Sequence, residues 1–159
     1  MRINLVAVGR RMPDWVDRGF SEYAKRLSKG VSLELIEVES PRRGNKSPSN
    51  QVVQEEGERL LQAVPKGSYQ IALDQTGRCY DSETLAGALS TWMHMGRDIA
   101  LIIGGPEGLS AQVLSAVDAK WSLSSLTLAH PLVRVILAEQ LYRSYAILEG
   151  LPYHRAGKV

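Results

Sequence analysis

The chain has 159 residues, which predicts one compact domain spanning residues 1–159 with a core of its own. Hydrophobic residues make up 44% of it and charged residues 23%, as in ordinary soluble globular proteins. The formal net charge of +2 does not require a nucleic-acid partner, but it allows a local basic patch.

Cysteine content and the lengths of the apolar runs bear on the cellular compartment. Cys79 is the only cysteine, which excludes an intrachain disulfide and a cysteine-based zinc site. No apolar run approaches the roughly 20 residues of a membrane helix, and the N-terminal run is too short for a signal peptide. We therefore expect a cytoplasmic protein with no membrane partner and no bound metal.

The first half of the chain alternates strand and helix patterns. Residues 3–8 form a short apolar run of the kind that is buried on both faces of a sheet, and residues 31–39 alternate like a second strand. Residues 13–29 and 52–64 carry apolar side chains at helical spacing. After the second strand, residues 41–50 (PRRGNKSPSN) contain three cations, two prolines and no hydrophobic residue, which predicts an exposed, mobile loop.

The second half continues the alternation with three more strands. Residues 69–73 and 99–103 are short apolar runs, and residues 121–128 (WSLSSLTL) predict a strand that passes into a loop. Strand and helix patterns thus alternate along the whole chain, which favours an α/β fold with a mostly parallel sheet sandwiched by helices. The sequence shows no internal repeat and no second domain.

Terminal signals mark three helices in this half. Asp81 or Ser82 can cap the first helix, and Ser110 can cap the second. The last helix begins with Pro131 at its first position and ends just before Gly150. Apolar residues cover it almost all round, so we expect it to be buried on several sides. We expect this helix to pack against a second copy of the chain in a homodimer. A central position in the core of a monomer is the alternative.

The stretch LIIGGPEGLS places Gly104 and Gly105 directly after a buried strand. Open α/β sheets bind ligands outside the carboxyl ends of their strands, where glycine lets a flat ligand approach the backbone. A tight turn without a ligand would use the same residues. The dinucleotide and P-loop motifs are both absent here, so a cofactor bound through adenine and ribose fits better than a phosphate-rich one.

The stretch LSSLTL can wall the same pocket from the next strand. Its backbone and hydroxyl groups suit the edge of an adenine, although a plain strand with a polar outer face would show the same pattern. The third strand would supply a floor. The expected cofactor-binding residues are Leu73, Gly104, Gly105, Leu123, Ser124, Ser125, Leu126, Thr127 and Leu128.

Five stretches together carry a recognisable pattern. They are LVAVGRRMPDWVDRGFSEYAKRL, EEGERLL, IIGGPEGLS, SLSSLTLAHPLVRVILAEQLYRSYAI and the terminal PYHR. In combination they closely resemble the SPOUT-class ribosomal RNA large subunit methyltransferase H family. The resemblance covers essentially the whole chain except the loop at residues 41–50.

The resemblance implies a SPOUT fold with a deep trefoil knot in its C-terminal part, a homodimer, and S-adenosyl-L-methionine as methyl donor. The implied reaction is methylation of N3 of a pseudouridine in 23S rRNA of an assembled ribosome. A SPOUT methyltransferase that acts on tRNA is the alternative within the same class. A dinucleotide-dependent oxidoreductase and a noncatalytic RNA-binding module are the rival classes. Periodicity alone would not predict the knot, because knots are nearly absent from proteins.

Methyl transfer to N3 requires loss of the N3 proton, so the site needs a base or a cation that stabilises the anion. His154 is the candidate base because its pKa range suits the task, with Tyr153 and Arg155 completing a catalytic cluster in the tail. Residues at a terminus usually fray, so this expectation rests on the resemblance. Glu107 and His130 are the next candidates for the base.

Four cations are candidates for contact with rRNA. Arg42, Arg43 and Lys46 lie in the expected loop, where they can follow a phosphate backbone without reading bases. Arg134, in the last helix, can hold a phosphate or a developing oxyanion.

Overall fold

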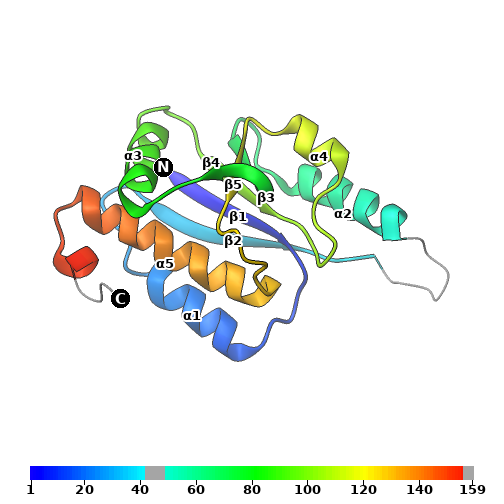
Figure 1. Cartoon of the computed structure of the whole chain (residues 1–159), viewed down its shortest axis with the longest axis horizontal. Coiled ribbons are helices and arrows are strands. Elements are labelled where there is room, and N and C mark those ends of the chain that lie inside the picture. Colours follow the sequence, from blue (N-terminus) through cyan, green and yellow to red (C-terminus); the bar gives the residue numbers. More distant parts are fainter. Residues whose placement is uncertain (42–48, 156–159) are drawn as a thin grey trace.

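The computed structural model describes residues 1–41 and 49–155, with a parallel sheet at its centre (Figure 1). Among the described residues the sheet has five strands in the order β2-β1-β4-β3-β5, and every neighbouring pair is parallel. The strands are β1 (Arg2–Val8), β2 (Ser32–Val38), β3 (Tyr69–Cys79), β4 (Ile99–Ile103) and β5 (Ala119–Ser122). The predicted α/β class with a parallel sheet is confirmed.

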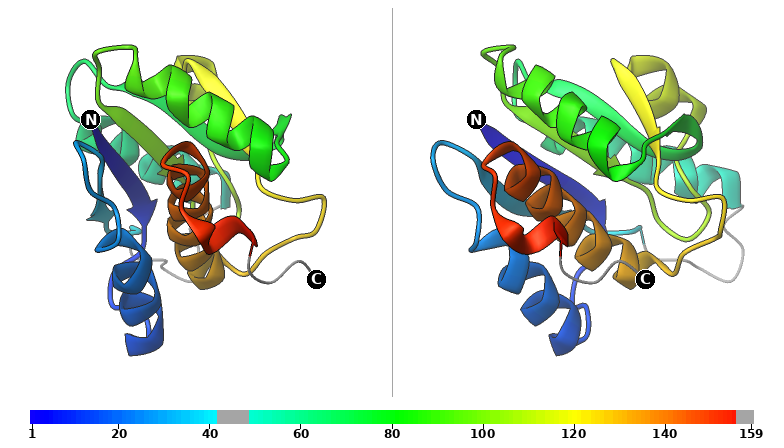
Figure 2. Two further views of the ribbon diagram at one scale, coloured as in Figure 1. Left: turned by 90° about the vertical axis from the view of Figure 1, so that its left-hand side faces the viewer. Right: turned by 60° about the vertical axis from the view of Figure 1, so that its left-hand side comes forward.

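Helices cover both faces of the sheet (Figure 2). Helices α1, α3 and α5 pack on one face, and α2 and α4 pack on the other. The helices are α1 (Asp14–Ala24), α2 (Ser49–Ala63), α3 (Ser82–Met93), α4 (Ala111–Ala116) and α5 (His130–Leu148), followed by the short 3₁₀ helix η1 (Pro152–Arg155). The sheet is therefore sandwiched, with one hydrophobic core on each side.

The neighbouring inner strands β1 and β4 contribute to both cores. In β1, Leu5 and Ala7 belong to the core under α1, α3 and α5, whereas Val6 and Val8 belong to the core under α2 and α4. Successive side chains of a strand point to opposite faces, so a strand buried on both faces needs a continuous apolar run. All of β4 is buried in the same way.

Side chains at the helix starts act as the sequence predicts. Asp81, not Ser82, caps α3: its Oδ1 accepts the Thr84 N–H at 2.8 Å, and Thr84 Oγ1 accepts the Asp81 N–H at 3.0 Å. At the start of α4, Ser110 Oγ accepts the Val113 N–H at 3.2 Å. Each hydrogen bond satisfies a backbone donor that a helix terminus leaves without a partner.

Helix α1 is shorter than the predicted span of residues 13–29. It ends at Ala24, and the chain then turns through Lys29 and Gly30, whose φ angles of +51° and +84° lead into β2. The apolar pattern continues into this turn because Leu27 still packs against the core. Helical periodicity therefore overestimates the length of the helix here.

Strand β3 is longer than predicted because it runs through the polar stretch DQTGRC. Its pairing with β5 shifts register between Leu73 and Arg78. Gly77 permits the close approach, since a Cβ at this position would lie 2.5 Å from the backbone N of Trp121. The irregular strand carries Leu73 and the residues after it along the edge of the candidate site.

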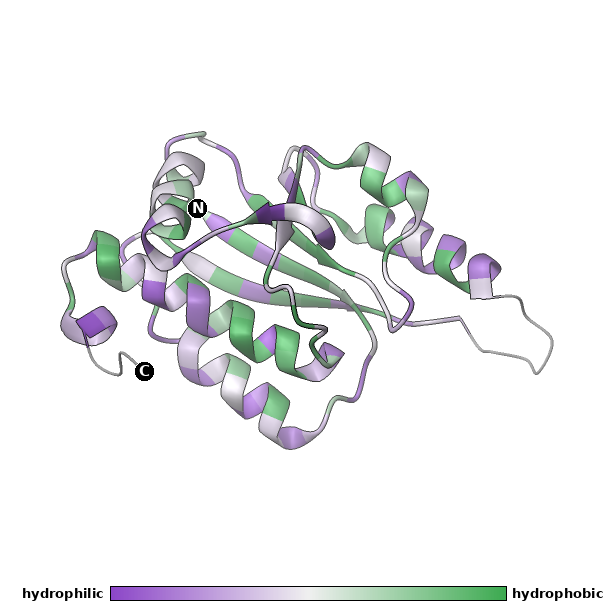
Figure 3. Ribbon diagram, in the orientation of Figure 1, coloured by the Kyte–Doolittle hydropathy of each residue, from purple (hydrophilic) through white to green (hydrophobic). Residues whose placement is uncertain are grey.

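Helix α5 packs against α1 and α3. It begins at His130, one residue before the predicted start, and Gly150 follows its end with φ +68°. Leu132 and Leu148 remain exposed, and Figure 3 shows apolar residues along both α5 and α1. The homodimer and the trefoil knot stay predictions.

Candidate active site

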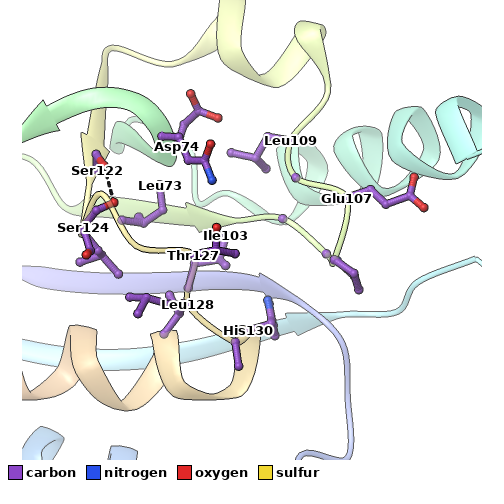
Figure 4. Close-up of a pocket in the computed structure, with 18 of the residues that line it drawn as sticks. Leu73, Asp74, Ile103, Glu107, Leu109, Ser122, Ser124, Thr127, Leu128 and His130 are labelled. Carbon is purple, nitrogen blue, oxygen red and sulfur yellow. Dashed lines mark hydrogen bonds between the residues drawn. The ribbon is translucent and has the colours of Figure 1, made fainter.

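A cavity of about 860 Å³ opens at the carboxyl ends of β3, β4 and β5 (Figure 4). Four segments form its walls: residues 73–76, 103–109, 121–124 and 126–131, with Val133 added from α5. Its volume is that of a small-molecule site, for which about 300–1,000 Å³ is usual. The position, outside the carboxyl ends of parallel strands, is where α/β sheets bind ligands.

Eight of the nine expected cofactor residues line this cavity. They are Leu73, Gly104, Gly105, Leu123, Ser124, Leu126, Thr127 and Leu128. Ser125 is the exception, because the cavity wall passes from Ser124 to Leu126. The irregular second half of β3 and the loops that follow β4 and β5 thus converge on one pocket.

Hydrogen bonds within the loop at residues 123–128 fix its shape. Ser122 Oγ donates to the Ser124 carbonyl at 3.3 Å, and Ser124 Oγ accepts the Leu126 N–H at 2.9 Å. The Ser122 and Ser124 hydroxyls therefore organise the wall, which leaves backbone groups and Thr127 for a ligand. Leu126 is 74% exposed at the cavity.

The two glycines have a packing role that the sequence did not predict. A Cβ on Gly104 would lie 2.5 Å from the Gly108 carbonyl oxygen, and one on Gly105 would lie 2.7 Å from Glu56 Oε2. Both positions would therefore meet protein atoms. The absence of side chains lets the turn at residues 104–108 fold tightly and pack on α2. Both glycines also line the cavity, and their expected role in admitting the cofactor stays a prediction.

The cavity has a polar part that the sequence reasoning did not assign to it. Asp74 Oδ2 accepts the Thr76 N–H at 3.0 Å and also the Thr76 hydroxyl, and Gln75 completes this part of the wall. The sequence did contain a signal for this polar part. Polar residues directly follow the apolar run at residues 69–73, so they lie at the same sheet edge as the glycine turn. Glu107 also lines the cavity.

His130 lines the cavity from the first position of α5. Burial, and next the positive charge of Arg134, lower the pKa of His130 below its ordinary value of 6.5. The ring is thus neutral at neutral pH. Its Nε2 atom is buried without a hydrogen-bond partner in the described part of the chain.

Arg134 does not lie on the surface, where a contact with RNA would require it to be. Its side chain is fully buried, with Nη1 2.6 Å from Glu37 Oε2 and Nη2 2.8 Å from the Gly9 carbonyl oxygen. The guanidinium joins α5 to the ends of β1 and β2. Its placement argues against the expected phosphate contact, because a buried and paired charge cannot reach a polyanion.

The tail lies away from the cavity of its own chain. Tyr153 packs on the middle of α5, where its hydroxyl donates to Glu139 Oε1 at 2.9 Å. Glu139 follows His130 by nine residues, about 14 Å along the helix axis. His154 Nε2 lies 3.2 Å from Glu83 Oε1 of α3, and none of residues 153–155 lines the cavity.

The remaining expectations concern the loop, metals and membranes. Arg42, Arg43 and Lys46 lie outside the described residues. Within residues 1–41 and 49–155, no group of His, Cys, Asp and Glu side chains is arranged to hold a metal ion. No helix in this part of the chain is long and apolar enough to cross a membrane.

Comparisons of the sequence give a family for the whole chain. The family model described as "Predicted SPOUT methyltransferase" matches residues 1–154. A protein of Thioalkalivibrio sulfidiphilus named ribosomal RNA large subunit methyltransferase H is 50% identical over 155 residues, which cover 98% of this chain and 99% of that protein. A protein of the same name from Alkalilimnicola ehrlichii is 50% identical over 157 residues, covering 98% and 100%.

Solved structures share the fold at low sequence identity. A probable methylase family protein from Haemophilus influenzae has a TM-score of 0.55 at 16% identity, over 95% of this chain and 68% of that one. A structure described as "Structural insights into the 2-OH methylation of C/U34 on tRNA" has a TM-score of 0.51 at 18% identity, over 91% of each chain. With the fold and the cavity, these matches show that the chain belongs to the SPOUT methyltransferases, in the family of ribosomal RNA large subunit methyltransferase H.

Proposed function

We propose that this enzyme transfers a methyl group from S-adenosyl-L-methionine to N3 of a pseudouridine in 23S rRNA of the assembled ribosome. The observation that carries the proposal is the cavity where β3, β4 and β5 end, in a chain whose 50%-identical relatives are named rRNA methyltransferases. Those names favour rRNA over the tRNA alternative. A ribosomal substrate also fits a cytoplasmic enzyme.

The residues of the cavity suit S-adenosyl-L-methionine. Leu73, Ile103 and Leu128 supply apolar surface for a flat base, and the turn and loop backbones offer donors and acceptors. Asp74 and Glu107 bring negative charge to a site for a cationic sulfonium. When bound, the cofactor supplies an electrophilic methyl group, so the protein must chiefly align it with the ring nitrogen.

A homodimer would bring the tail to this cavity. Leu132 of α5 and Trp15 of α1 are exposed apolar side chains that a second copy could cover. The tail would then reach the partner's cavity, where His154 would take the N3 proton and Arg155 would stabilise the anion. Arg42, Arg43 and Lys46 would contact rRNA phosphates.

Calorimetry and methylation assays together test the proposal. S-adenosyl-L-methionine should bind the pure protein and NADH should not, which separates a methyltransferase from an oxidoreductase. Ribosomes lacking the modification should then gain one methyl group, located on a 23S rRNA pseudouridine by mass spectrometry. Methylation of tRNA but not of ribosomes would replace the proposal by its alternative, and failure of the cofactor to bind would overturn both.

A further inference from the structure

Glu56 is a buried carboxylate close to the cavity but outside its wall. It lies on α2 and is only 3% exposed. Ser40 Oγ donates a hydrogen bond to its Oε2 at 2.9 Å. A buried carboxylate is costly without such partners, so its presence behind the cofactor cavity calls for a physical reason.

The second neighbour of this carboxylate is the backbone of Gly105. A Cβ on Gly105 would lie 2.7 Å from Oε2 and 3.1 Å from Oε1 of Glu56, so the carboxylate fills the space that a side chain would take. Gly105 is not among the glycines with positive φ. Space, not backbone conformation, therefore accounts for glycine at this position.

The next residue, Gly57, brings α2 close to Ser110, which follows the glycine turn in the chain. A Cβ on Gly57 would lie 2.3 Å from Ser110 Oγ, the atom that caps α4. Between these two contacts the turn is closed by the Gly108 N–H, which donates to the Gly105 carbonyl at 3.0 Å. The motif EEGERLL thus supports residues 105–110 from α2, which is not part of the cavity wall.

We propose that Glu56 is a positioning residue of the methyl-transfer site, whose carboxylate holds the Gly104–Gly108 turn in the shape that binds S-adenosyl-L-methionine. The proposal rests on the proposed function of the cavity. Glu56 lies outside the cavity wall and acts through Gly105, which lines the cavity. Support of this kind is what keeps a binding site within fractions of an ångström of its productive geometry.

A double-mutant cycle between Glu56 and Gly105 tests this role. Gly105→Ala and Glu56→Ala should each weaken cofactor binding about tenfold in calorimetry, which corresponds to about 1.4 kcal/mol. The double variant should bind no more weakly than Glu56→Ala alone, because truncation makes room for the new methyl group. Glu56→Gln should keep nearly full affinity, since its amide retains the size and accepts the Ser40 hydrogen bond.

Gly104→Ala is the matched control. Its new Cβ would meet the backbone of Gly108, which truncation of Glu56 does not move, so Glu56→Ala should add to its effect. Equal damage from Gly105→Ala with and without Glu56 would show that the glycine serves ligand approach and would overturn the proposal. Unchanged cofactor affinity in Glu56→Ala would overturn it too.

Two further measurements keep the result separate from protein folding and from the proposed function. If urea unfolding shows that Glu56→Ala does not fold, the cycle is run with Glu56→Asp, which also withdraws the carboxylate from Gly105. Without any cofactor, amide hydrogen exchange at Gly104, Gly105, Glu107 and Gly108 should be faster in the Glu56 variant than in the wild type. Unchanged exchange contradicts the positioning role, whereas failure of the wild type to bind the cofactor contradicts only the proposed function.

Discussion

The hydroxyl of Tyr153 donates to Glu139 Oε1 at 2.9 Å, and the same oxygen accepts Arg143 Nη2 at 2.6 Å. The Tyr153 ring meets Tyr142 edge to face, with centroids 4.7 Å apart, and the Arg143 guanidinium lies 5.0 Å from its centroid. Burial, and next the Glu139 carboxylate, raise the pKa of Tyr153 well above 10. Tyr153 is thus placed as a protonated anchor of the tail, and it does not have the properties of a base.

Tyr153→Phe should lower kcat for ribosome methylation and leave cofactor affinity unchanged. The variant keeps the ring contacts and loses a hydrogen bond to a charged group, worth about 1.5–3 kcal/mol, so we expect roughly a tenfold effect or more. Single-turnover methylation and calorimetry measure the two quantities. Tyr69→Phe is the control. Tyr69 is the first residue of β3 and does not line the cavity, so this variant should behave as wild type.

Full activity of Tyr153→Phe would show that ring packing alone holds the tail. Tyr153→Ala, which removes both kinds of contact, would then have to carry the whole effect. If that variant also keeps its activity, the tail is not anchored through Tyr153 and His154 needs another support.

Strands buried on both faces were the most predictable part of this fold. β4 lies at the predicted residues, because an apolar run bounded by polar residues and glycine has few other solutions. Most residues of the cavity wall were predictable for the same reason, since β3, β4 and β5 carry them to one edge of the sheet. Local pattern and sheet geometry suffice for such residues.

Contacts between distant segments were not predictable in this way. Nothing in the pattern around Gly105 shows that its missing side chain makes room for Glu56, 49 residues earlier in the chain. Arg134 was expected to hold a phosphate or an oxyanion, because its position in a helix does not reveal an acceptor such as Glu37 on another element. Both depend on packing, which only the three-dimensional structure supplies.

His130 should titrate below its ordinary pKa of 6.5 in the folded protein. The unfolded chain would take up a proton near pH 6.5 that the folded chain binds only at lower pH. The free energy of unfolding should therefore fall as the pH drops below 6.5. The stability that the neutral His130 ring contributes should be fully present above pH 6.5. NMR titration of the ring measures the pKa directly.

His130→Asn isolates this contribution from those of other groups. Urea unfolding of wild type and variant at pH 7.5 and 5.5 gives two differences in stability, and the wild type should lose more on acidification. Equal losses in both proteins, or an NMR pKa at or above 6.5, would contradict the neutral, buried ring.

Arg134→Met should destabilise the protein by about 3 kcal/mol, the scale for breaking a buried ion pair. It removes the partner of Glu37 and leaves the Gly9 carbonyl without its 2.8 Å donor. Arg10→Met, which breaks an exposed pair with Glu39, is the control and should cost less than about 1 kcal/mol. Urea unfolding measures both, and a stable Arg134→Met variant with a reduced salt dependence of ribosome binding would restore the RNA contact.

Deletion of residues 153–159 should abolish methylation and leave folding, dimerisation and cofactor affinity largely intact. The reason is that none of residues 153–155 lines the cavity of its own chain, whereas we expect the tail to complete the partner's site. Light scattering, calorimetry and the methylation assay measure these properties. A monomer at micromolar concentration, or full activity of the truncated protein, would contradict the shared site.

Mixed dimers separate a shared site from a site within one chain. The truncated chain keeps its cavity, and Gly104→Val keeps its tail but crowds the turn against the Gly108 carbonyl. Each homodimer should be inactive. A mixed dimer has one complete site if the tail acts across the interface, so random pairing should restore about a quarter of wild-type activity. If the tail acts on its own chain, the mixture stays inactive, because neither subunit then has both a working cavity and a tail.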